Sequence, residues 1–142
     1  MNYWLLKTEP TTFSWDDLVS DHKHRGYSEW DGVRNYAARN NMREMKQGDF
    51  AFIYYSGTNA REIIGVAQIF HEIHRDSTDT TRTWQSVDII PIAKLARTVS
   101  LKEIKSLRAL DAMCLVNRGR LSVQPVTQTE WKIILKLSET AA

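Results

Sequence analysis

The chain has 142 residues, of which 42% are hydrophobic and 25% are charged, and its net charge is +2. This length fits one domain with a buried core, and the composition excludes a disordered chain. No apolar run approaches the roughly 20 residues of a membrane helix, so no membrane partner is expected. The single cysteine, Cys114, excludes an internal disulfide and is typical of a reducing compartment. We therefore expect a cytoplasmic protein.

No repeat, low-complexity tract or linker divides the chain. We expect one domain over residues 1–138 and a disordered C-terminal tail over residues 139–142. The N-terminus has no basic leader before an apolar stretch, so no signal peptide is expected. The oligomeric state does not follow from the sequence, and a monomer is favoured as the simplest case.

The first part of the chain predicts a strand followed by short helices. Residues 2–7 are apolar enough for a buried strand. Ser14 and Asp17 have the spacing of a capping box at the start of a short helix. A polar loop is predicted over residues 21–26, and residues 35–45 have a helical composition.

The rest of the chain predicts further strands with two more helices. Ser100 with Glu103, and Thr127 with Glu130, have capping-box spacing. A polar loop over residues 58–62 predicts a hairpin. The strands are predicted over residues 50–55, 63–73, 84–92 and 121–126. Strands interrupted by short helices favour an α+β domain built on a small β-barrel of about five to six strands, not a parallel βαβ sheet.

No residue pattern indicates a metal site, a cofactor or an enzyme. His71 and His74 lie three residues apart in a predicted strand, where alternation places them on opposite faces. All four histidines are expected to be exposed. Cys114 has apolar neighbours, so we expect a buried and inert thiol. Phosphate-binding loops, dinucleotide fingerprints and nucleophile elbows are absent.

One short stretch contains the side chains of a base-binding site. Trp30, Arg34 and Asn35 bring an indole, a guanidinium and a carboxamide within six positions. An indole can stack on a base, a carboxamide offers a donor and an acceptor, and a guanidinium can bind phosphate. The alternative is structural: Trp30 is a core residue and Arg34 pairs with Asp31 or Glu29.

Polar residues also end two predicted strands. Lys7, Thr8 and Glu9 end the first strand, and Tyr55 and Ser56 end another. If these ends meet at the mouth of a small barrel, they can form a ligand pocket. Residues 93–120 carry seven basic side chains against two acidic ones, which could follow a phosphate backbone or form a solvated helix face.

These segments resemble the EVE domain, a branch of the PUA-like superfamily related to the YTH readers of methylated adenine in RNA. The similarity runs in family order along nearly the whole chain, and the run WDGVRNY is its most specific part. The similar stretches are YWLLKTEP (residues 3–10), FSWDDL (13–18), WDGVRNY (30–36), YYS (54–56), IGVA (64–67), VDI (87–89) and LSVQPV (121–126).

The resemblance implies a PUA-like small β-barrel flanked by short helices. It also implies a non-catalytic pocket for a flipped-out modified base, either a 5-methylcytosine-type base in DNA or a modified base in RNA. The family often has Tyr-His-Ser where this chain has Tyr54, Tyr55 and Ser56, which places the identity of the base in question. The expected nucleic-acid-binding residues are Lys7, Thr8, Trp15, Trp30, Arg34, Asn35, Tyr55, Ser56 and Gln124.

Within this set, Trp30 is expected to stack on the base, and Trp30→Ala to leave the fold intact while abolishing binding. Lys7, Asn35 and Ser56 are expected to contact the base edge. Arg34 and Gln124 are expected at the rim or the backbone, and Trp15 either at the site or as core support.

Two alternatives remain open. The first is an enzyme that acts on the flipped base, such as a glycosylase with Asp31 or Glu9 as base and Lys7 as helper. The second is a binder of peptides or methyl-ammonium groups, because aromatic cages also bind cations.

Overall fold

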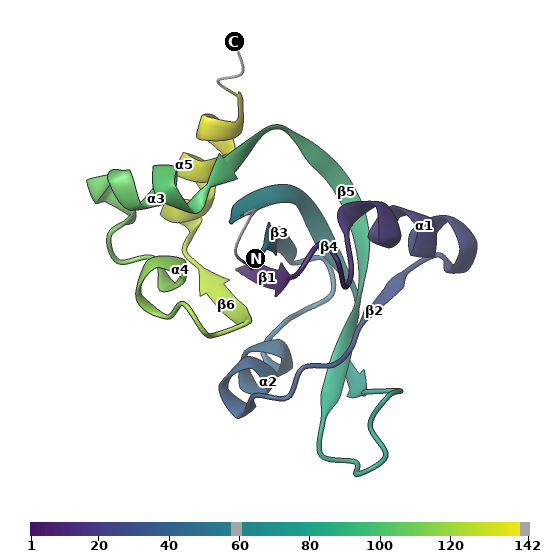
Figure 1. The fold of residues 1–142 in the computed structure, drawn as a ribbon. Helices are drawn as coiled ribbons and strands as arrows, with labels where there is room; N and C mark the ends of the chain where they lie inside the picture. Colours follow the sequence, from purple (N-terminus) through teal and green to yellow (C-terminus); the bar gives the residue numbers. More distant parts are fainter. Residues whose placement is uncertain (58–60, 140–142) are drawn as a thin grey trace.

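A single mixed sheet organises the molecule, with helices around it (Figure 1). The computed structural model describes residues 1–57 and 61–139. The strands are β1 (Tyr3–Thr8), β2 (Ser28–Trp30), β3 (Phe50–Tyr55), β4 (Glu62–Arg75), β5 (Gln85–Ser100) and β6 (Val123–Val126). The helices are α1 (Trp15–Arg25), α2 (Tyr36–Arg43), α3 (Leu101–Ser106), α4 (Cys114–Asn117) and α5 (Gln128–Glu139), with a 3-10 turn over Arg108–Leu110. The α+β class is therefore confirmed.

The strand order is β2-β5-β4-β3-β1-β6. Only β1 and β3 run parallel, and the other neighbouring pairs are antiparallel. Four register irregularities bend the long β4–β5 pair, because bulges increase the local twist of a strand. The sheet curls strongly (Figure 1), but no pairing among the described residues joins β2 to β6. Helix α2 packs against both β5 and β6, so a helix covers the opening where a closed barrel was expected.

Local sequence signals located most elements, with errors at their ends. The polar loop predicted over residues 21–26 is wrong, because α1 continues to Arg25 and ends at Gly26, which adopts a left-handed φ of 87°. Helix α2 ends at Arg43, before the predicted residue 45. Strand β5 runs on to Ser100, beyond the predicted residue 92.

The predicted hairpin is confirmed by the antiparallel register of β3 and β4. Residues 58–60 of its loop lie outside the described part of the chain. The predicted tail begins at Glu139, which is instead the last residue of α5, and residues 140–142 also lie outside the description. None of the helices described is long and apolar enough to cross a membrane.

Two of the predicted capping boxes are confirmed. Ser14 Oγ accepts from Asp17 N at 3.2 Å, and the Asp17 carboxylate accepts from Ser14 N at 2.9 Å. Thr127 and Glu130 make the same reciprocal pair at the start of α5. The third box is incomplete. Ser100 Oγ accepts from the Glu103 backbone, but the Glu103 carboxylate pairs with a guanidinium, that of Arg97.

The sheet is buried on both faces. In β1 the side chains alternate, so Trp4 and Leu6 belong to one apolar cluster and Leu5 to the other. Helix α1 closes over the first face at Gly65, where a Cβ atom would lie 2.5 Å from the Trp15 ring. Only glycine permits this approach, which anchors the start of α1 to β4.

Candidate nucleic-acid interface

The main cavity, of about 550 Å³, lies where β1 ends, α1 begins and the chain leaves β2. Its apolar wall contains Phe13 and Trp30, whose rings meet edge to face with centroids 5.8 Å apart. Trp30 is only 7% exposed and also belongs to the core cluster behind the wall. Lys7, Asp31 and Arg34 add charged groups to the lining.

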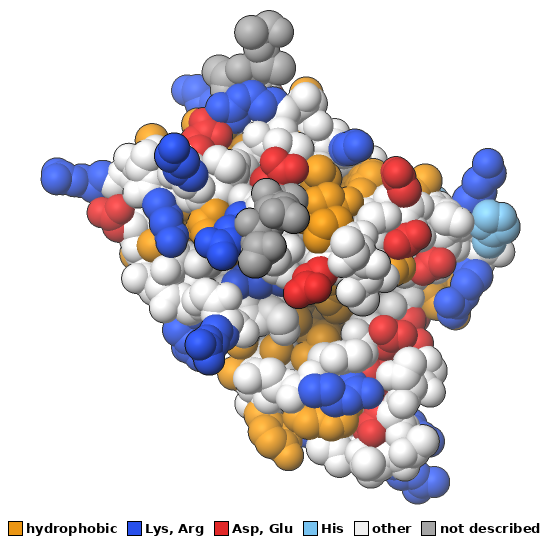
Figure 2. Space-filling model, viewed as in Figure 1, with side chains coloured by type: hydrophobic (Ala, Val, Ile, Leu, Met, Phe, Trp, Pro, Cys, Tyr) orange, Lys and Arg blue, Asp and Glu red, His pale blue; other side chains and the backbone are white. Residues whose placement is uncertain are grey.

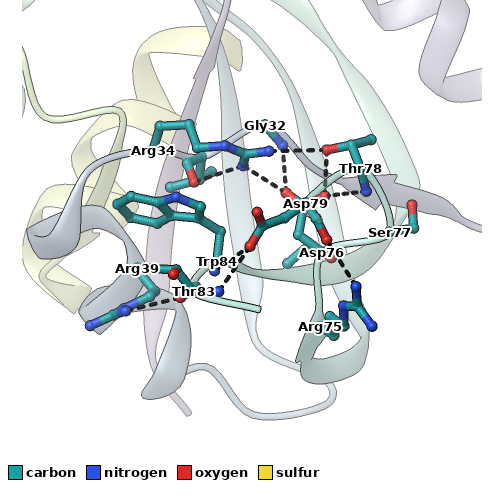
Figure 3. A network of polar contacts seen from close by, with 12 residues as sticks. Gly32, Arg34, Arg39, Arg75, Asp76, Ser77, Thr78, Asp79, Thr83 and Trp84 are labelled. Atoms are coloured by element: carbon teal, nitrogen blue, oxygen red, sulfur yellow. Dashed lines mark hydrogen bonds and ion pairs between the residues drawn. The ribbon is translucent and has the colours of Figure 1, made fainter. Parts of the chain in front are cut away.

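A buried carboxylate holds the turn that follows β2. Asp76 is fully buried, and its Oδ2 accepts from Gly32 N at 2.8 Å and from Arg34 Nη1 at 3.0 Å. Its Oδ1 accepts from the Thr78 backbone and hydroxyl at 2.7 and 2.6 Å. Figure 3 shows this network converging on Asp76 from both loops. Gly32 has a φ of 78°, which glycine adopts without strain.

The hydrogen bonds of Asp76 decide its ionisation. Burial acts to raise the pKa of its carboxyl, but the bonds from Thr78, Gly32 and Arg34 outweigh burial and hold the pKa below its usual range. The turn is therefore pinned by a carboxylate that stays charged at neutral pH. Arg34 pairs with this residue, not with Asp31 or Glu29, the partners considered from the sequence.

Two of the carboxyls that line the cavity, those of Glu29 and Asp31, have pKa values shifted in opposite directions. The Glu29 carboxylate accepts hydrogen bonds from Ser77 and from Ser86, and these bonds outweigh the effect of burial and lower its pKa. At Asp31 burial raises the pKa, and the negative charges of Asp76 and Glu29 raise it further. Of these two, Asp31 is the carboxyl whose protonation is more easily coupled to a ligand.

Aromatic and cationic side chains lie next to the cavity. The Trp84 ring lies 4.9 Å from that of Tyr36, which is 59% exposed. The guanidinium of Arg34 lies 5.9 Å from the Trp84 ring, and that of Arg39 lies 4.8 Å from the Tyr36 ring. Figure 3 shows Arg34 and Trp84 side by side. These contacts link the cavity rim to an exposed aromatic surface.

Sequence reasoning missed the loop between β4 and β5. Asp76 and Asp79 are each followed two positions later by a threonine, Thr78 and Thr81, whose backbone and hydroxyl both donate to the preceding carboxylate. This repeated Asp-x-Thr spacing is typical of side-chain-stabilised turns and could have predicted the loop from the sequence. The sequence alone did not indicate that Asp76 also contacts Gly32.

The structure brings together four of the predicted site residues. Lys7, Thr8, Trp30 and Arg34 all line the main cavity. Ser56 lines a second cavity, which it shares with Lys7.

The other four predicted residues make internal contacts. Asn35 lines a shallow basic pocket, and its Oδ1 caps α2 by accepting from Ala38 N at 2.9 Å. Gln124 is fully buried, and its Nε2 donates to the carbonyls of Arg118 and Leu121, both at 2.9 Å. Gln124 thereby shapes the turn that precedes β6.

Trp15 and Tyr55 hold the first turn of α1. The Trp15 backbone N–H donates to the Tyr55 hydroxyl at 2.8 Å, while the indole covers Gly65. The Thr8 hydroxyl donates to the Phe13 backbone carbonyl at 2.9 Å, which holds the Phe13 backbone beside the cavity. These contacts favour core support as the role of Trp15.

The prediction that His71 and His74 lie on opposite faces is wrong. Both rings contact one carboxylate, with His71 Nδ1 2.8 Å and His74 Nε2 2.9 Å from the oxygens of Asp88. The β4–β5 register shifts between the two histidines, so strict alternation fails there. His74 is half-buried and the other three histidines are exposed. Within the described ranges, no three potential ligands cluster as a metal site.

Cys114 is half-buried, where a fully buried thiol was expected, and burial raises the pKa of its thiol. The basic residues of positions 93–120 are mostly exposed, with the exception of Arg97, which pairs with Glu103. Figure 2 shows Lys and Arg side chains gathered on the side of the molecule where α3 and α4 lie.

Comparison with known proteins identifies the family. The family model described as "EVE domain" matches residues 2–137. Thymocyte nuclear protein 1 of Mus musculus is 36% identical over 98% of this chain and 74% of its own length.

Solved structures agree with this match. The protein Rpa0253 of Rhodopseudomonas palustris has a TM-score of 0.90 at 39% identity, covering 100% of this chain and 96% of that one. Human THYN1, solved in complex with 5-methylcytosine-containing DNA, has a TM-score of 0.88 at 32% identity and covers 100% of both chains. The YTH domain of Zygosaccharomyces rouxii MRB1, in complex with N6-methyladenosine RNA, shares the fold with a TM-score of 0.54 at 14% identity, covering 96% of this chain and 86% of that one. The fold is PUA-like, as expected, and the chain belongs to the EVE domain family.

Proposed function

We propose that this protein is a non-catalytic nucleic-acid-binding module that holds a flipped-out modified base in the main cavity. The base is of the 5-methylcytosine type in DNA, or a modified base in RNA. The observation that carries the proposal is a cavity of about 550 Å³ that combines the aromatic wall of Phe13 and Trp30 with charged groups at its rim. The human relative bound to 5-methylcytosine DNA supports it.

The lining residues offer complementary contacts for such a base. The Trp30 indole supplies a surface for stacking, and Phe13 and Val33 supply apolar contact for a methyl group. The Asp31 carboxylate can accept from the exocyclic amino group of a cytosine, and Lys7 can donate to a base carbonyl. Stacking contributes about 1–3 kcal/mol, which offsets the few kcal/mol that extruding a base costs.

The roles first expected for Asn35 and Gln124 change in this proposal. Both side chains already make hydrogen bonds within the protein, at the start of α2 and in the turn before β6. We assign them to positioning the cavity walls, with Lys7, Asp31 and Trp30 contacting the base.

The test is a binding series with DNA and RNA oligonucleotides that differ only in one modified base. Wild type is compared with Asp31→Asn and with Asp16→Asn, which removes an exposed acid of α1 outside the cavity. A hydrogen bond to a charged group is worth about 1.5–3 kcal/mol, so Asp31→Asn should weaken binding of the preferred oligonucleotide roughly 10- to 100-fold. The Asp16→Asn control should bind like wild type. Equal affinity for modified and unmodified oligonucleotides in wild type would overturn the proposal.

One observation favours a second candidate, an enzyme that acts on the flipped base. Asp31 lines the cavity and its pKa is raised, as suits a general acid or base, whereas Glu9 does not line the cavity. Incubation of the protein with the preferred oligonucleotide, followed by analysis for free base and cleaved strand, separates the two functions. If wild type releases free base and Asp31→Asn does not, the protein is an enzyme that acts on the base.

The cellular location stays a prediction. The relatives from five vertebrates are named as nuclear proteins, a designation that does not match the cytoplasmic location expected from the sequence. Imaging of the tagged full-length chain in its own cells decides between the two.

A further inference from the structure

A second cavity, of about 460 Å³, lies beside the main one, between the ends of β1 and β3 and the helices α3 and α4. Three cationic residues line it, Lys7, Arg61 and Lys105, and none of its described lining residues is acidic. Lys7 also lines the main cavity, so this side chain lies between the two.

These cations have no carboxylate partner within residues 1–57 and 61–139. Lys7 Nζ donates to the Gly119 carbonyl at 2.5 Å, and Arg61 Nε donates to the Gly57 carbonyl at 2.9 Å. Because an ammonium has three donors and a guanidinium five, further donors remain for a ligand. Burial lowers the pKa of Lys7, which means that its charge lacks solvation that a bound anion would replace.

Neutral donors complete the cavity. Tyr54 and Ser56 belong to its lining, and their hydroxyls make no hydrogen bond within the described part of the chain. Burial raises the pKa of Tyr54, so its hydroxyl stays protonated and can donate at neutral pH. Hydroxyl, ammonium and guanidinium donors around a cavity free of carboxylates are the groups that bind phosphate oxygens.

We propose that this second cavity binds a backbone phosphate of the nucleic-acid strand whose modified base occupies the main cavity. The inference rests on the proposed function. In a nucleotide only the sugar separates the base from its phosphates, and among the described residues Lys7 alone lines both cavities. A phosphate contact of this kind fixes the position of the strand and contributes no base discrimination.

The test uses the double variant Arg61→Gln/Lys105→Gln and a matched double control, Lys102→Gln/Arg108→Gln. The control removes the same charge from two exposed residues that do not line the cavity, one on α3 and one just after it. In the first arm, inorganic phosphate is titrated into each protein, and the backbone amide NMR signals of Ser56, Gly57 and Gly119 are followed. We expect these signals to shift saturably with phosphate in wild type and in the control. In the cavity variant we expect no saturable shift.

In the second arm, binding of the preferred oligonucleotide is measured from 50 to 300 mM salt. The plot of log affinity against log salt has a negative slope. In the cavity variant this slope should be shallower than in the control by about 0.7–0.9, the value for one phosphate contact. The preference for the modified over the unmodified oligonucleotide should be retained.

Each outcome has a distinct meaning. Absence of saturable shifts in wild type overturns the phosphate site. Shifts without a change of slope show that the cavity takes free phosphate, and overturn the assignment to the strand. If wild type binds modified and unmodified oligonucleotides equally, the base-binding proposal alone is overturned, because the phosphate titration does not depend on a base preference.

Discussion

The guanidinium of Arg34 and the carboxylate of Asp76 lie 3.0 Å apart and join the turn after β2 to the loop between β4 and β5. The pair is asymmetric in burial, since the Arg34 side chain is 40% exposed and that of Asp76 is fully buried. The same Asp76 oxygen accepts from Gly32 N, so one atom fixes both the backbone and a side chain of the cavity rim. The geometry of the rim therefore depends on a loop that contributes only Ser77 to the cavity lining.

The first prediction concerns Asp76→Asn. This variant keeps the size of the side chain but removes the charge that four hydrogen bonds stabilise. We expect the free energy of unfolding to fall by roughly 1–3 kcal/mol, because buried donors lose a charged acceptor. We also expect weaker binding of the modified oligonucleotide, because the Gly32–Arg34 turn is released. Urea denaturation and the binding series measure the two effects.

The pH dependence of this effect follows from the lowered pKa of Asp76. A carboxyl whose pKa is lower in the folded state stabilises the protein above its unfolded pKa of about 3.9, and this contribution is lost as the pH falls through the folded pKa. The difference in unfolding free energy between wild type and Asp76→Asn should therefore be constant from pH 5 to 7 and shrink below about pH 4. A difference that is the same at pH 3 and pH 6 would contradict the ionised state assigned to Asp76.

The sequence predicted contacts between residues close together in the chain better than contacts between distant residues. The Ser14–Asp17 and Thr127–Glu130 boxes were predicted because they involve residues three positions apart. The contact of Asp76 with Gly32 spans 44 positions and depends on the register of the sheet, which composition does not reveal.

The binding role of the predicted site residues stays a prediction, but their positions can be compared with the cavities. The sequence placed Trp30 and Arg34 at a pocket, and both line the main cavity. Asn35 has the same donor and acceptor chemistry whether it contacts a base or caps a helix, and only the backbone of α2 distinguishes the two. The basic residues Arg61 and Lys105 were not singled out as a pair, because they meet only after β3, β4 and α3 have come together.

The second prediction revises the expected effect of Trp30→Ala. Because Trp30 is 7% exposed and packs in the core, its removal should lower the free energy of unfolding by about 3–5 kcal/mol. Trp30→Ala should therefore destabilise the fold. Trp30→Phe keeps an aromatic ring in the wall and should retain the fold, with reduced affinity for the modified base. Thermal denaturation and oligonucleotide binding are compared for both variants. If Trp30→Phe is folded and binds as tightly as wild type, the indole makes no specific contribution to binding.

The third prediction separates capping from base contact at Asn35. Asn35→Ala should cost about 1 kcal/mol of stability, because the Ala38 N–H loses its acceptor, whereas Asn35→Ser restores a capping oxygen. If Asn35 only positions the wall, Asn35→Ser should match wild type in both stability and binding. A stable Asn35→Ser variant with weakened binding would instead place the carboxamide in contact with nucleic acid.

The fourth prediction concerns the two histidines on Asp88. Burial acts to lower the pKa of His74, but its hydrogen bonds to Asp88 and to the Arg75 carbonyl outweigh burial and raise the pKa. A histidine with a raised pKa stabilises the fold fully below its unfolded pKa of about 6.5, and this contribution is lost as the pH rises through the folded pKa. The wild-type advantage over His74→Asn should therefore decline as the pH rises above 6.5.

NMR titration of the His74 ring measures the cause directly. Asp88→Asn removes the negative charge that both rings contact, so the pKa of His74 should fall in this variant. The His71→Asn variant keeps that carboxylate, and the pKa of His74 should there stay above its ordinary value. If His74 titrates identically in wild type and in Asp88→Asn, the contact with Asp88 does not raise its pKa, and the Arg75 carbonyl and the negative charge of Glu29 account for the shift.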